Sequence, residues 1–592
     1  MSTFIDFQIK QGNSRNGPVR VMNGPWREEQ ISETISKAES WPLNPGPKIR
    51  DLYTEVTRPS FKLWILGEVY SYKSARLKDG KASIINAITQ DVASDQLDAA
   101  QLNGHFVMLV YYTKSSLWKL YTDRLGTYHI YYGTVANTNV LGTYYRAVSD
   151  AMQTKTLNEE ALQGYLSCGF FLQNTTFFKE IDIMKGSTEY TFDKNLNLIS
   201  RSVYWKPTHN PRTRSYSDTI DLLSEVINNV TEDLTSNGRI AIPISGGLDS
   251  RMMAGVCTLP DIGTNKKFWS YSYGYAEDSV EIKIASKVAM ARNLPFKQKV
   301  ISNYLFDRQG EVSDCIELFQ YIDGTRQADI VEDMSIESDY VMAAHWGDVW
   351  FDAMAQEGSL KGKDLSGYAF NKFKKNGSDW LVNNVLHTSL DSTNDWVKEA
   401  LRQELNTFDS IADPDFKIKM LKTTQWSFRW TLASIRMFQS GAFPRLPFYD
   451  NRIVDLFATI PTSFLVNRKL QIDYLKRYHP DLAAITWQEY GSNLYRYKYW
   501  NNRMLPYRIL SKIARTVKGT SSIARNWEIF YLNKEGRQNL TNNLLNSPLT
   551  SIVSKDEIHK LLNEFYRKPD GGNGYTISML HTYAIFLKMH LG

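Results

Sequence analysis

Short apolar runs separated by turn residues dominate the first part of the chain. The run 106–112 is typical, and runs of this length bounded by turn residues predict strands. From residue 219 to residue 230 the apolar positions recur at helical spacing, and strands and helices then alternate to about residue 345. Helical patterns dominate beyond that point. The sequence therefore predicts an α/β protein: a layered antiparallel α+β domain, then a parallel-sheet α/β domain with a helical C-terminal part.

One segment divides these two patterns. Residues 205–214 are polar, carry Pro207 and Pro211, and show no apolar period. Such a stretch is typical of a linker. We therefore predict two domains, 1–205 and 206–592.

A glycine turn follows the apolar strand 240–244 and precedes a helix expected from residue 251. Glycines bring several N–H groups to one point, and the helix N-terminus adds a positive field, which favours phosphate. An acid there would repel phosphate unless a metal lay between them, so Asp249 is predicted to ligate Mg²⁺. The turn lacks the Gly-Lys-Ser/Thr ending of common phosphate loops, so pyrophosphate release fits better than γ-phosphate transfer. The predicted ATP/pyrophosphate-binding residues are Ser245, Gly246, Gly247, Leu248, Asp249 and Ser250.

A second acidic side chain follows another apolar run. Residues 340–344 predict a strand that opens into a short turn carrying Asp348. In an open α/β sheet ligands gather at the carboxyl ends of strands, so Asp249 and Asp348 are predicted to share one metal site. The alternatives are a ligand-free turn at Asp249 and a helix cap at Asp348.

These elements occur in the order seen in one known family. The glycine turn, the strand 269–275, the Asp348 turn and the segment 447–450 resemble the synthetase domain of glutamine-dependent asparagine synthetases. The wider superfamily includes β-lactam synthetases and lasso-peptide cyclases. The resemblance implies activation of a carboxylate as an acyl-adenylate with Mg-ATP, release of pyrophosphate, and amide formation by an attacking amine. By family position, Ser272, Tyr273 and Gly274 line the adenine side.

The first two hundred residues resemble the glutaminase domain of the same family, which implies that the layered antiparallel domain is of the Ntn-hydrolase-like type. Segments 102–106 and 120–132 are similar to two of its strands. The nucleophile of that domain is a cysteine exposed by removal of Met1, but position 2 here is Ser2. We therefore expect no glutaminase activity. The amine is then expected on the substrate or a partner, as in the β-lactam synthetase and lasso branches.

Two further positions depart from the family pattern. Where asparagine synthetases have a glutamate and β-lactam synthetases a tyrosine, three residues before the second metal ligand, this chain has His345. An imidazole is a competent general base, and a packed or capping histidine is the alternative. The family's adenylate-stabilising lysine corresponds to Gln488. Three explanations stay open. Lys498 or Arg496 replaces the lysine, the alignment is shifted, or the adenylation chemistry is weakened.

Composition and charge indicate the compartment and the kinds of partner that the protein has. Three cysteines without a pairing pattern fit a reducing compartment, and neither a signal peptide nor an apolar run of about eighteen residues is found. A cytoplasmic protein without a membrane segment is expected. A net charge of +6 over 592 residues is mild and predicts no nucleic-acid partner. A run rich in tyrosine and basic residues, 495–518, is a solvated helix face or a site for an anionic or peptide substrate.

The sequence thus predicts an AMP-forming carbon–nitrogen ligase with ATP and Mg²⁺ as cofactors. His345 and Asp348 are the predicted catalytic residues, and Asp249 and Asp348 the metal ligands. The expected partners are a small-molecule or peptide carboxylate and an amine, and a homo-oligomer or a biosynthetic partner protein stays open. Alternative functions are an amidotransferase using external ammonia, a lasso-type macrocyclase and a catalytically inactive scaffold.

Overall fold

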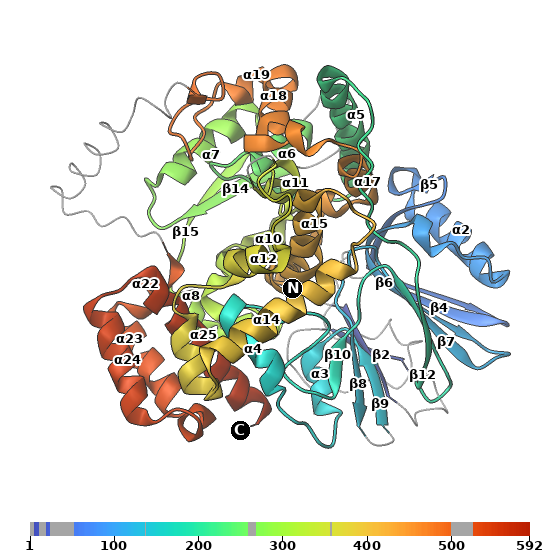
Figure 1. Ribbon diagram of the computed structural model, residues 1–592. Coiled ribbons are helices and arrows are strands. Elements are labelled where there is room, and N and C mark those ends of the chain that lie inside the picture. Colours follow the sequence, from blue (N-terminus) through green and yellow to red (C-terminus); the bar gives the residue numbers. More distant parts are fainter. Residues whose placement is uncertain are drawn as a thin grey trace.

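Three β-sheets organise the chain (Figure 1). The computed structural model describes residues 5–10, 19–23, 52–135, 138–257, 268–355, 358–498 and 525–591. Two sheets are antiparallel and end at Val203, and the third is parallel and begins at Ile240. The predicted fold class is confirmed, whereas the division into 1–205 and 206–592 stays a prediction.

The two antiparallel sheets form the first part of the structure. One has the order β10-β8-β9-β1-β2, with strands Ile181–Ile183, Tyr131–Val135, Thr138–Gly142, Ile5–Lys10 and Val19–Asn23. The other has the order β12-β11-β7-β6-β4-β3, with β5 paired to β4. Its strands are Leu198–Val203, Thr188–Phe192, Leu117–Thr122, Leu102–Tyr112, Phe61–Tyr72, Tyr53–Arg58 and, for β5, Ala75–Arg76. Helices α2 (Lys81–Ala93), α3 (Tyr145–Asp150) and α4 (Glu159–Cys168) accompany these sheets.

Strands β4 and β6 form the longest pair and are buried over most of their length. Gly67 and Gly104 lie where the two backbones approach most closely. A methyl group on Gly67 would lie 2.2 Å from the His105 carbonyl oxygen, and one on Gly104 would lie 2.3 Å from the Glu68 carbonyl oxygen. Only glycine fits at these two positions.

The parallel sheet has the strand order β15-β14-β13-β16-β17. All four strand pairs are parallel, and the order reverses between β13 and β16. The gap above the carboxyl ends at such a reversal is where open α/β sheets bind ligands. The strands span Phe296–Val300, Phe268–Gly274, Ile240–Pro243, Tyr340–Met342 and Phe443–Arg445.

The elements around this sheet agree with the sequence prediction in type, although the predicted strands 240–244, 269–275 and 340–344 each end one or two residues earlier in the structure. Helix α5 (Tyr216–Leu234) contains the helix predicted at 219–230. Helix α6 (Asp249–Cys257) begins two residues earlier than predicted, so Asp249 lies in its first turn. Strand β17 was not predicted. It contains Pro444, which a ladder tolerates because β17 is an edge strand.

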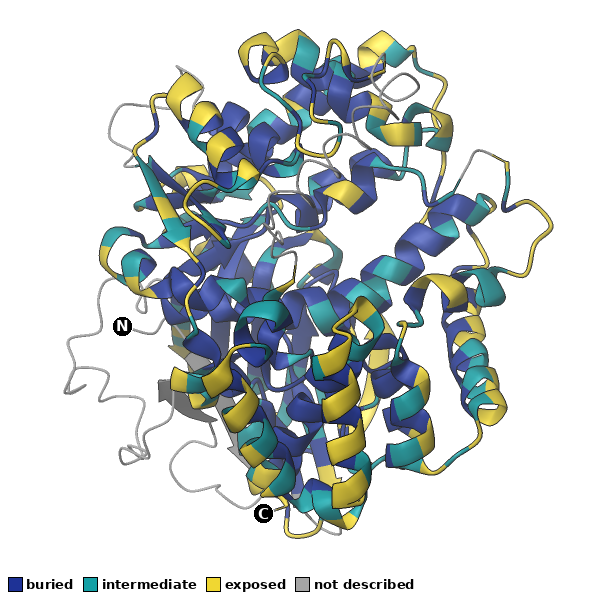
Figure 2. Cartoon of the chain, turned by 90° about the vertical axis from the view of Figure 1, so that its left-hand side faces the viewer, coloured by how far each residue is buried: buried dark blue, intermediate teal, exposed yellow. Residues whose placement is uncertain are grey.

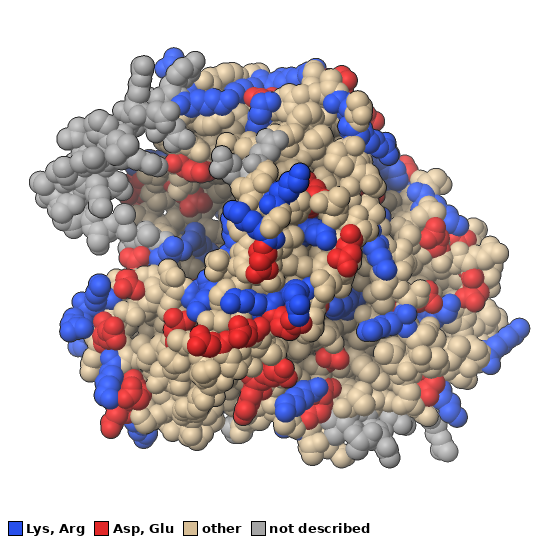
Figure 3. All heavy atoms as spheres, in the orientation of Figure 1, with Lys and Arg blue, Asp and Glu red and all other residues tan. Residues whose placement is uncertain are grey.

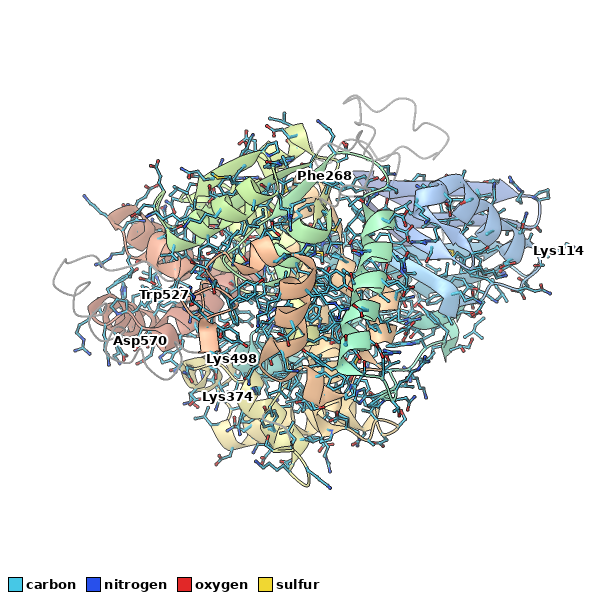
Figure 4. The ribbon with its side chains drawn as sticks, turned by 90° about the horizontal axis from the view of Figure 1, so that it is seen from above. Lys114, Phe268, Lys374, Lys498, Trp527 and Asp570 are labelled. Atoms are coloured by element: carbon cyan, nitrogen blue, oxygen red, sulfur yellow. The ribbon has the colours of Figure 1, made fainter. Side chains whose placement is uncertain are left out.

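Helices build the rest of the molecule and enclose its core (Figure 2). The last helix, α25, is buried over nearly all of Gly574–Leu587. In the view of Figure 4, Lys114 lies at one end of the molecule, and Trp527 and Asp570 lie towards the opposite end. Across the described ranges, no helix has the length and apolar character needed to cross a membrane. The helices are α7 Val280–Ala291, α8 Tyr304–Asp307, α9 Gln309–Ile316, α10 Val331–Glu337, α11 Gly347–Phe351, α12 Leu365–Phe373, α13 Ser378–Leu381, α14 Leu390–Asn406, α15 Pro414–Leu421, α16 Leu432–Arg436, α17 Asn451–Phe457, α18 Lys469–Tyr478, α19 Pro480–Ala483, α22 Asn526–Tyr531, α23 Lys534–Leu545, α24 Lys555–Arg567 and α25 Gly571–His590.

Candidate active site

The glycine turn joins the central strand β13 to helix α6. The Ser245 amide donates to Ser250 Oγ at 2.9 Å, and the two serine hydroxyls are also 2.9 Å apart. The Gly247 amide donates to Ser245 Oγ at 3.2 Å. Two hydroxyls and the backbone therefore brace the turn at the start of α6, and the same groups can donate to an anion.

The second turn follows β16 and carries Asp348 in the first turn of α11. Trp346 adopts a left-handed backbone with φ of 79°, which is unusual for a bulky residue. Its indole Nε1 donates to Thr423 Oγ1 at 3.0 Å, which fixes the side chain. Asp348 is exposed. The turn thus presents one carboxylate on the side of the sheet where β13 also ends.

The two predicted metal ligands lie on turns that touch each other. A methyl group on Gly347 would lie 2.8 Å from the Asp249 carboxylate, so Asp249 packs directly against the Asp348 turn. Burial raises the pKa of Asp249 to about 6, and the negative charge of Asp348 adds to this, against the opposing effect of Arg468. The structure therefore brings both carboxylates to the gap between β13 and β16.

Three residues at this site were missed by sequence reasoning. Arg468 Nη2 donates to Asp249 Oδ1, and Gln471 Nε2 donates to the same oxygen at 2.8 Å. Arg468 Nε and Gln471 Oε1 are buried and have no hydrogen-bond partner within the described part of the chain. The Lys422 ammonium lies 5.8 Å from the ring centre of Trp346. Burial lowers the pKa of Lys422, and Asp348 opposes that shift.

Gln488 lies on the glycine turn, where the resemblance placed the family lysine. Its backbone N–H donates to the Gly246 carbonyl at 3.2 Å, and its side chain covers Gly246. A methyl group on Gly246 would lie 2.1 Å from Gln488 Oε1. Arg496 and Lys498 are exposed and form no hydrogen bond or ion pair with the turn among the described residues. The rest of the basic and aromatic run, from residue 499 to residue 518, lies outside the described residues.

His345 is half-buried and precedes the Asp348 turn. Burial lowers its pKa to about 4, although Asp348 pulls in the opposite direction. The Phe438 ring centre lies 6.0 Å away, and Nδ1 has no hydrogen-bond partner among the residues that the structure describes. The imidazole is therefore neutral at pH 7 and has a ring nitrogen free to take a proton.

The residues predicted on the adenine side lie on the neighbouring strand. Ser272, Tyr273 and Gly274 end β14, which pairs with β13 and so reaches the same edge of the sheet. Gly274 packs on the helix that follows, because a methyl group there would lie 2.3 Å from Ser279 Oγ. Ser279 caps helix α7 through the Ile282 amide.

A cavity adjoins this site, and the molecular surface is hollowed nearby. The cavity has a volume of about 410 Å³ and is lined by Asp352, Ala353, Ala355, Val466 and Asn467. In Figure 3 a hollow separates the part with α7 and β15 from the part with α22–α24. A second cavity, of about 560 Å³, lies on helix α23 and contains none of the predicted site residues.

Ser2, which stands at the position of the expected cysteine nucleophile, lies outside the described residues. The three cysteines, Cys168, Cys257 and Cys315, are buried and form no disulfide. Burial raises the pKa of the Cys168 thiol to about 12. It is therefore not a thiolate at neutral pH and is a poor nucleophile.

Parts of the chain are similar to one protein family and to one curated relative. Residues 63–205 match the family described as a glutamine amidotransferase domain. Over 258 residues the chain is 22% identical to the asparagine synthetase [glutamine-hydrolyzing] 1 of Bacillus subtilis (strain 168), a match that covers 40% of this chain and 39% of the relative. The match thus spans about two fifths of the length of that curated relative.

Two solved structures are similar over part of the chain. The glutamine phosphoribosylpyrophosphate amidotransferase from B. subtilis, complexed with ADP and GMP, is 9% identical with a TM-score of 0.20, covering 51% of this chain and 61% of that one. An allosteric regulatory enzyme of purine biosynthesis is 8% identical with a TM-score of 0.21, covering 40% and 54%. These low scores add nothing to the assignment. The chain is therefore similar to an asparagine synthetase over about two fifths of its length, and residues 63–205 are similar to a glutamine amidotransferase domain.

Proposed function

We propose that this protein is an ATP-dependent, AMP-forming ligase that joins a carboxylate to an amine. The observation that supports this most directly is the contact between the Asp249 carboxylate and the Asp348 turn at the strand-order reversal. The glycine turn, the two carboxylates and the neutral His345 imidazole come from two turns that contact each other. This set suits nucleotide activation of an acid followed by attack of an amine.

The two carboxylates fit a magnesium ion that is also bound by phosphate. No group of three or more His, Cys, Asp or Glu side chains in the described ranges forms a metal cage. Mg²⁺ commonly takes only one or two protein carboxylates and completes its shell with water and substrate phosphates. Asp249 and Asp348 would hold it, and the bound ion would neutralise charge on the pyrophosphate portion of ATP.

In the first step an oxygen of the substrate carboxylate attacks the α-phosphorus of ATP. The bond between that phosphorus and the oxygen bridging to the β-phosphorus breaks, and pyrophosphate leaves with the electron pair. Negative charge gathers on the leaving group, and the turn N–H groups, the hydroxyls of Ser245 and Ser250 and the Arg468 guanidinium can stabilise it. Arg468 is next to this position because it already binds Asp249.

In the second step the amine nitrogen attacks the acyl carbon, and AMP leaves. The nitrogen must lose a proton, for which neutral His345 is the candidate base. The low pKa of His345 makes it a weak base, so we expect a contribution at the lower end for general bases, about a hundredfold. The amine comes from the substrate or a partner, because we expect no glutaminase activity from the first domain.

A catalytically inactive scaffold is the second candidate. The uncharged Gln488 on the glycine turn favours it, because no cationic side chain from that position faces the phosphates. An inactive scaffold would bind Mg-ATP weakly and release no pyrophosphate with any acid.

Binding of Mg-ATP tests the proposal first. We expect titration calorimetry to show at least a tenfold weaker affinity for Asp249→Asn, since losing a ligand of this kind costs more than about 1.4 kcal/mol. Asp391→Asn, which changes an exposed residue of α14, is the matched control. Equal affinity in Asp249→Asn and wild type would count heavily against the site.

Product analysis tests the reaction type. Screening candidate acids and amines by pyrophosphate release should give AMP and an amide by mass spectrometry. ADP in place of AMP would reject adenylation.

A further inference from the structure

Side chains of the predicted first domain, 1–205, contact one segment of the predicted second domain, 206–592, at both ends of that segment. This segment, residues 445–451, runs from the last residue of β17 into α17. At its start the Arg445 guanidinium forms a two-pronged ion pair with Glu68 of β4, with Nε–Oε2 at 2.7 Å and Nη2–Oε1 at 2.6 Å. The Arg445 side chain is fully buried and that of Glu68 is 4% exposed. Such a pair fixes direction as well as distance.

The remaining donors of Arg445 are also used. Nη1 donates to the Leu234 carbonyl at 2.6 Å, and Nη2 donates to Asn237 Oδ1 at 2.6 Å. The guanidinium carbon lies 3.4 Å from the ring centre of Tyr340, the first residue of β16. Burial works against the charge, but Glu68 more than offsets it and raises the pKa of Arg445 above its usual range. Arg445 is therefore locked in one position.

The other end of the segment is held by Asn103 of β6. Asn103 Nδ2 donates to Asp450 Oδ2 at 3.0 Å, and Asn103 Oδ1 accepts from the Asn451 amide at 2.9 Å. Asn451 Nδ2 in turn donates to the Leu102 carbonyl at 2.9 Å. Both ends of the segment thus depend on side chains of the first domain.

The middle of the segment packs on the turn that carries Asp348. The Phe448 ring contacts Gly347 so closely that a methyl group there would lie 2.8 Å from Cε2. The Phe448 carbonyl accepts from Trp350 Nε1 at 2.8 Å. Tyr449 OH lies 2.5 Å from Ser427 Oγ, which fixes the adjacent side chain. A shift of this segment would therefore move the Asp348 turn.

We propose that the first domain acts as a clamp, in which Glu68 and Asn103 are positioning residues that hold segment 445–451 and, through Phe448, the Asp348 turn. Its catalytic meaning rests on the proposed function, but the mechanical coupling does not. The clamp gives the domain a role that needs no nucleophile. If the interface only stabilised the fold, breaking its contacts would loosen the Asp348 turn no more than the rest of the molecule.

Hydrogen exchange followed by mass spectrometry tests the coupling without nucleotide. Glu68→Gln removes the charge at one end of the segment, and Asn103→Ala removes the contacts at the other. We expect both variants to speed amide exchange in 345–351 by about tenfold or more, while exchange in α25 stays as in wild type. The matched control is Arg124→Met, because Arg124 also pairs across the parts, with Asp455 at 2.5 Å, but does not contact the segment's clamped ends.

The location of the change decides the outcome. Faster exchange confined to 445–451, or spread equally over α25, would overturn the clamp, since the first shows no transmission and the second shows general loosening. If Glu68→Gln does not yield folded protein, Asn103→Ala carries the test alone. Arg124→Met producing the same change at 345–351 would also overturn it.

Mg-ATP affinity separates the clamp from the proposed function. Loss of a partner that orients a metal ligand typically costs 10–100-fold, so the Kd of Glu68→Gln for Mg-ATP should rise about tenfold and that of Arg124→Met should not. If the wild type does not bind Mg-ATP, but the two variants show the expected faster exchange in 345–351, the proposed function is refuted and the clamp stands. A wild type that binds, with unchanged exchange in 345–351 of both variants, would refute the clamp and keep the function.

Discussion

Gly347 and the Asp249 carboxylate are packed so closely that no side chain fits between them. A methyl group on Gly347 would lie 2.8 Å from both Asp249 Oδ1 and Phe448 Cε2. Three elements, α6, α11 and segment 445–451, therefore meet at one glycine. The spacing of the two carboxylates depends on the absence of a Cβ at this position.

Gly347→Ala should therefore weaken Mg-ATP binding more than it weakens the fold. The added methyl pushes the Asp249 carboxylate away from the Asp348 turn, and overpacking of this kind costs about 1–3 kcal/mol. We expect at least a tenfold rise in Kd by calorimetry. Gly310→Ala is the control, because space around Gly310 is open and the residue lies in helix α9. If the two variants bind alike, the packing at Gly347 does not set the site.

Gln488→Lys should strengthen nucleotide binding. The Gln488 side chain already covers Gly246, so a lysine there would bring an ammonium to the predicted phosphate position. A hydrogen bond to a charged group contributes about 1.5–3 kcal/mol, which corresponds to a tenfold or greater drop in Kd. Gln488→Met has similar length without charge and should bind as wild type does. Unchanged affinity in the lysine variant would place the phosphates elsewhere.

His345→Asn should slow amide formation without slowing adenylation. The side chain is a candidate base only for the second step, and base catalysis contributes about a hundredfold or more. We expect kcat for the amide product to fall by about that factor, while exchange of labelled pyrophosphate into ATP keeps its rate. Because burial lowers the pKa of His345 to about 4, the wild-type rate should not depend on this group above pH 5. An equal fall in both activities would assign His345 to the structure of the site.

Acid should destabilise the protein through buried histidines. Burial lowers the pKa of His105, His129 and His581 from 6.5 to about 3 each. Between pH 3 and pH 6.5 these three histidines bind more protons in the unfolded chain than in the folded protein, so their contribution to stability rises with pH across that range. We expect this contribution to lower the Tm as the pH falls below 6.5.

The variant His129→Gln should flatten that dependence, whereas His559→Gln should not. His129 is buried, and its Nε2 donates to the Phe428 carbonyl at 2.6 Å, while His559 is exposed. Melting curves followed by circular dichroism between pH 4 and pH 7.5 measure the effect. A wild-type Tm that does not change with pH would show that the buried histidines do not govern acid stability.

The turns of the site could be predicted because local sequence determines them. An apolar run followed by two glycines and an acid specifies a strand, a tight turn and a helix start without help from distant residues. The sequence also placed Asp348 at the end of a second strand. The contact between the two turns then follows from the parallel sheet, where β13 and β16 are neighbours.

The side chains that bind Asp249 and the residues of the clamp could not be predicted in the same way. Arg468 and Gln471 reach Asp249 from a turn and a helix about 220 residues away, and their local pattern is that of an ordinary amphipathic helix. Glu68 and Asn103 lie in strands whose pattern indicates only burial. Strand β17 was missed because it is three residues long and contains Pro444.

The pair formed by Glu68 and Arg445 also limits how the gene can be divided or recombined. A chimera whose first part lacks the Glu68 carboxylate would leave the Arg445 guanidinium unpaired at a buried contact. Breaking a buried pair in this way costs about 3–5 kcal/mol, a large part of what a typical domain has to spare. Chimeras with relatives should therefore carry both halves of this contact together, whatever chemistry their first domain retains.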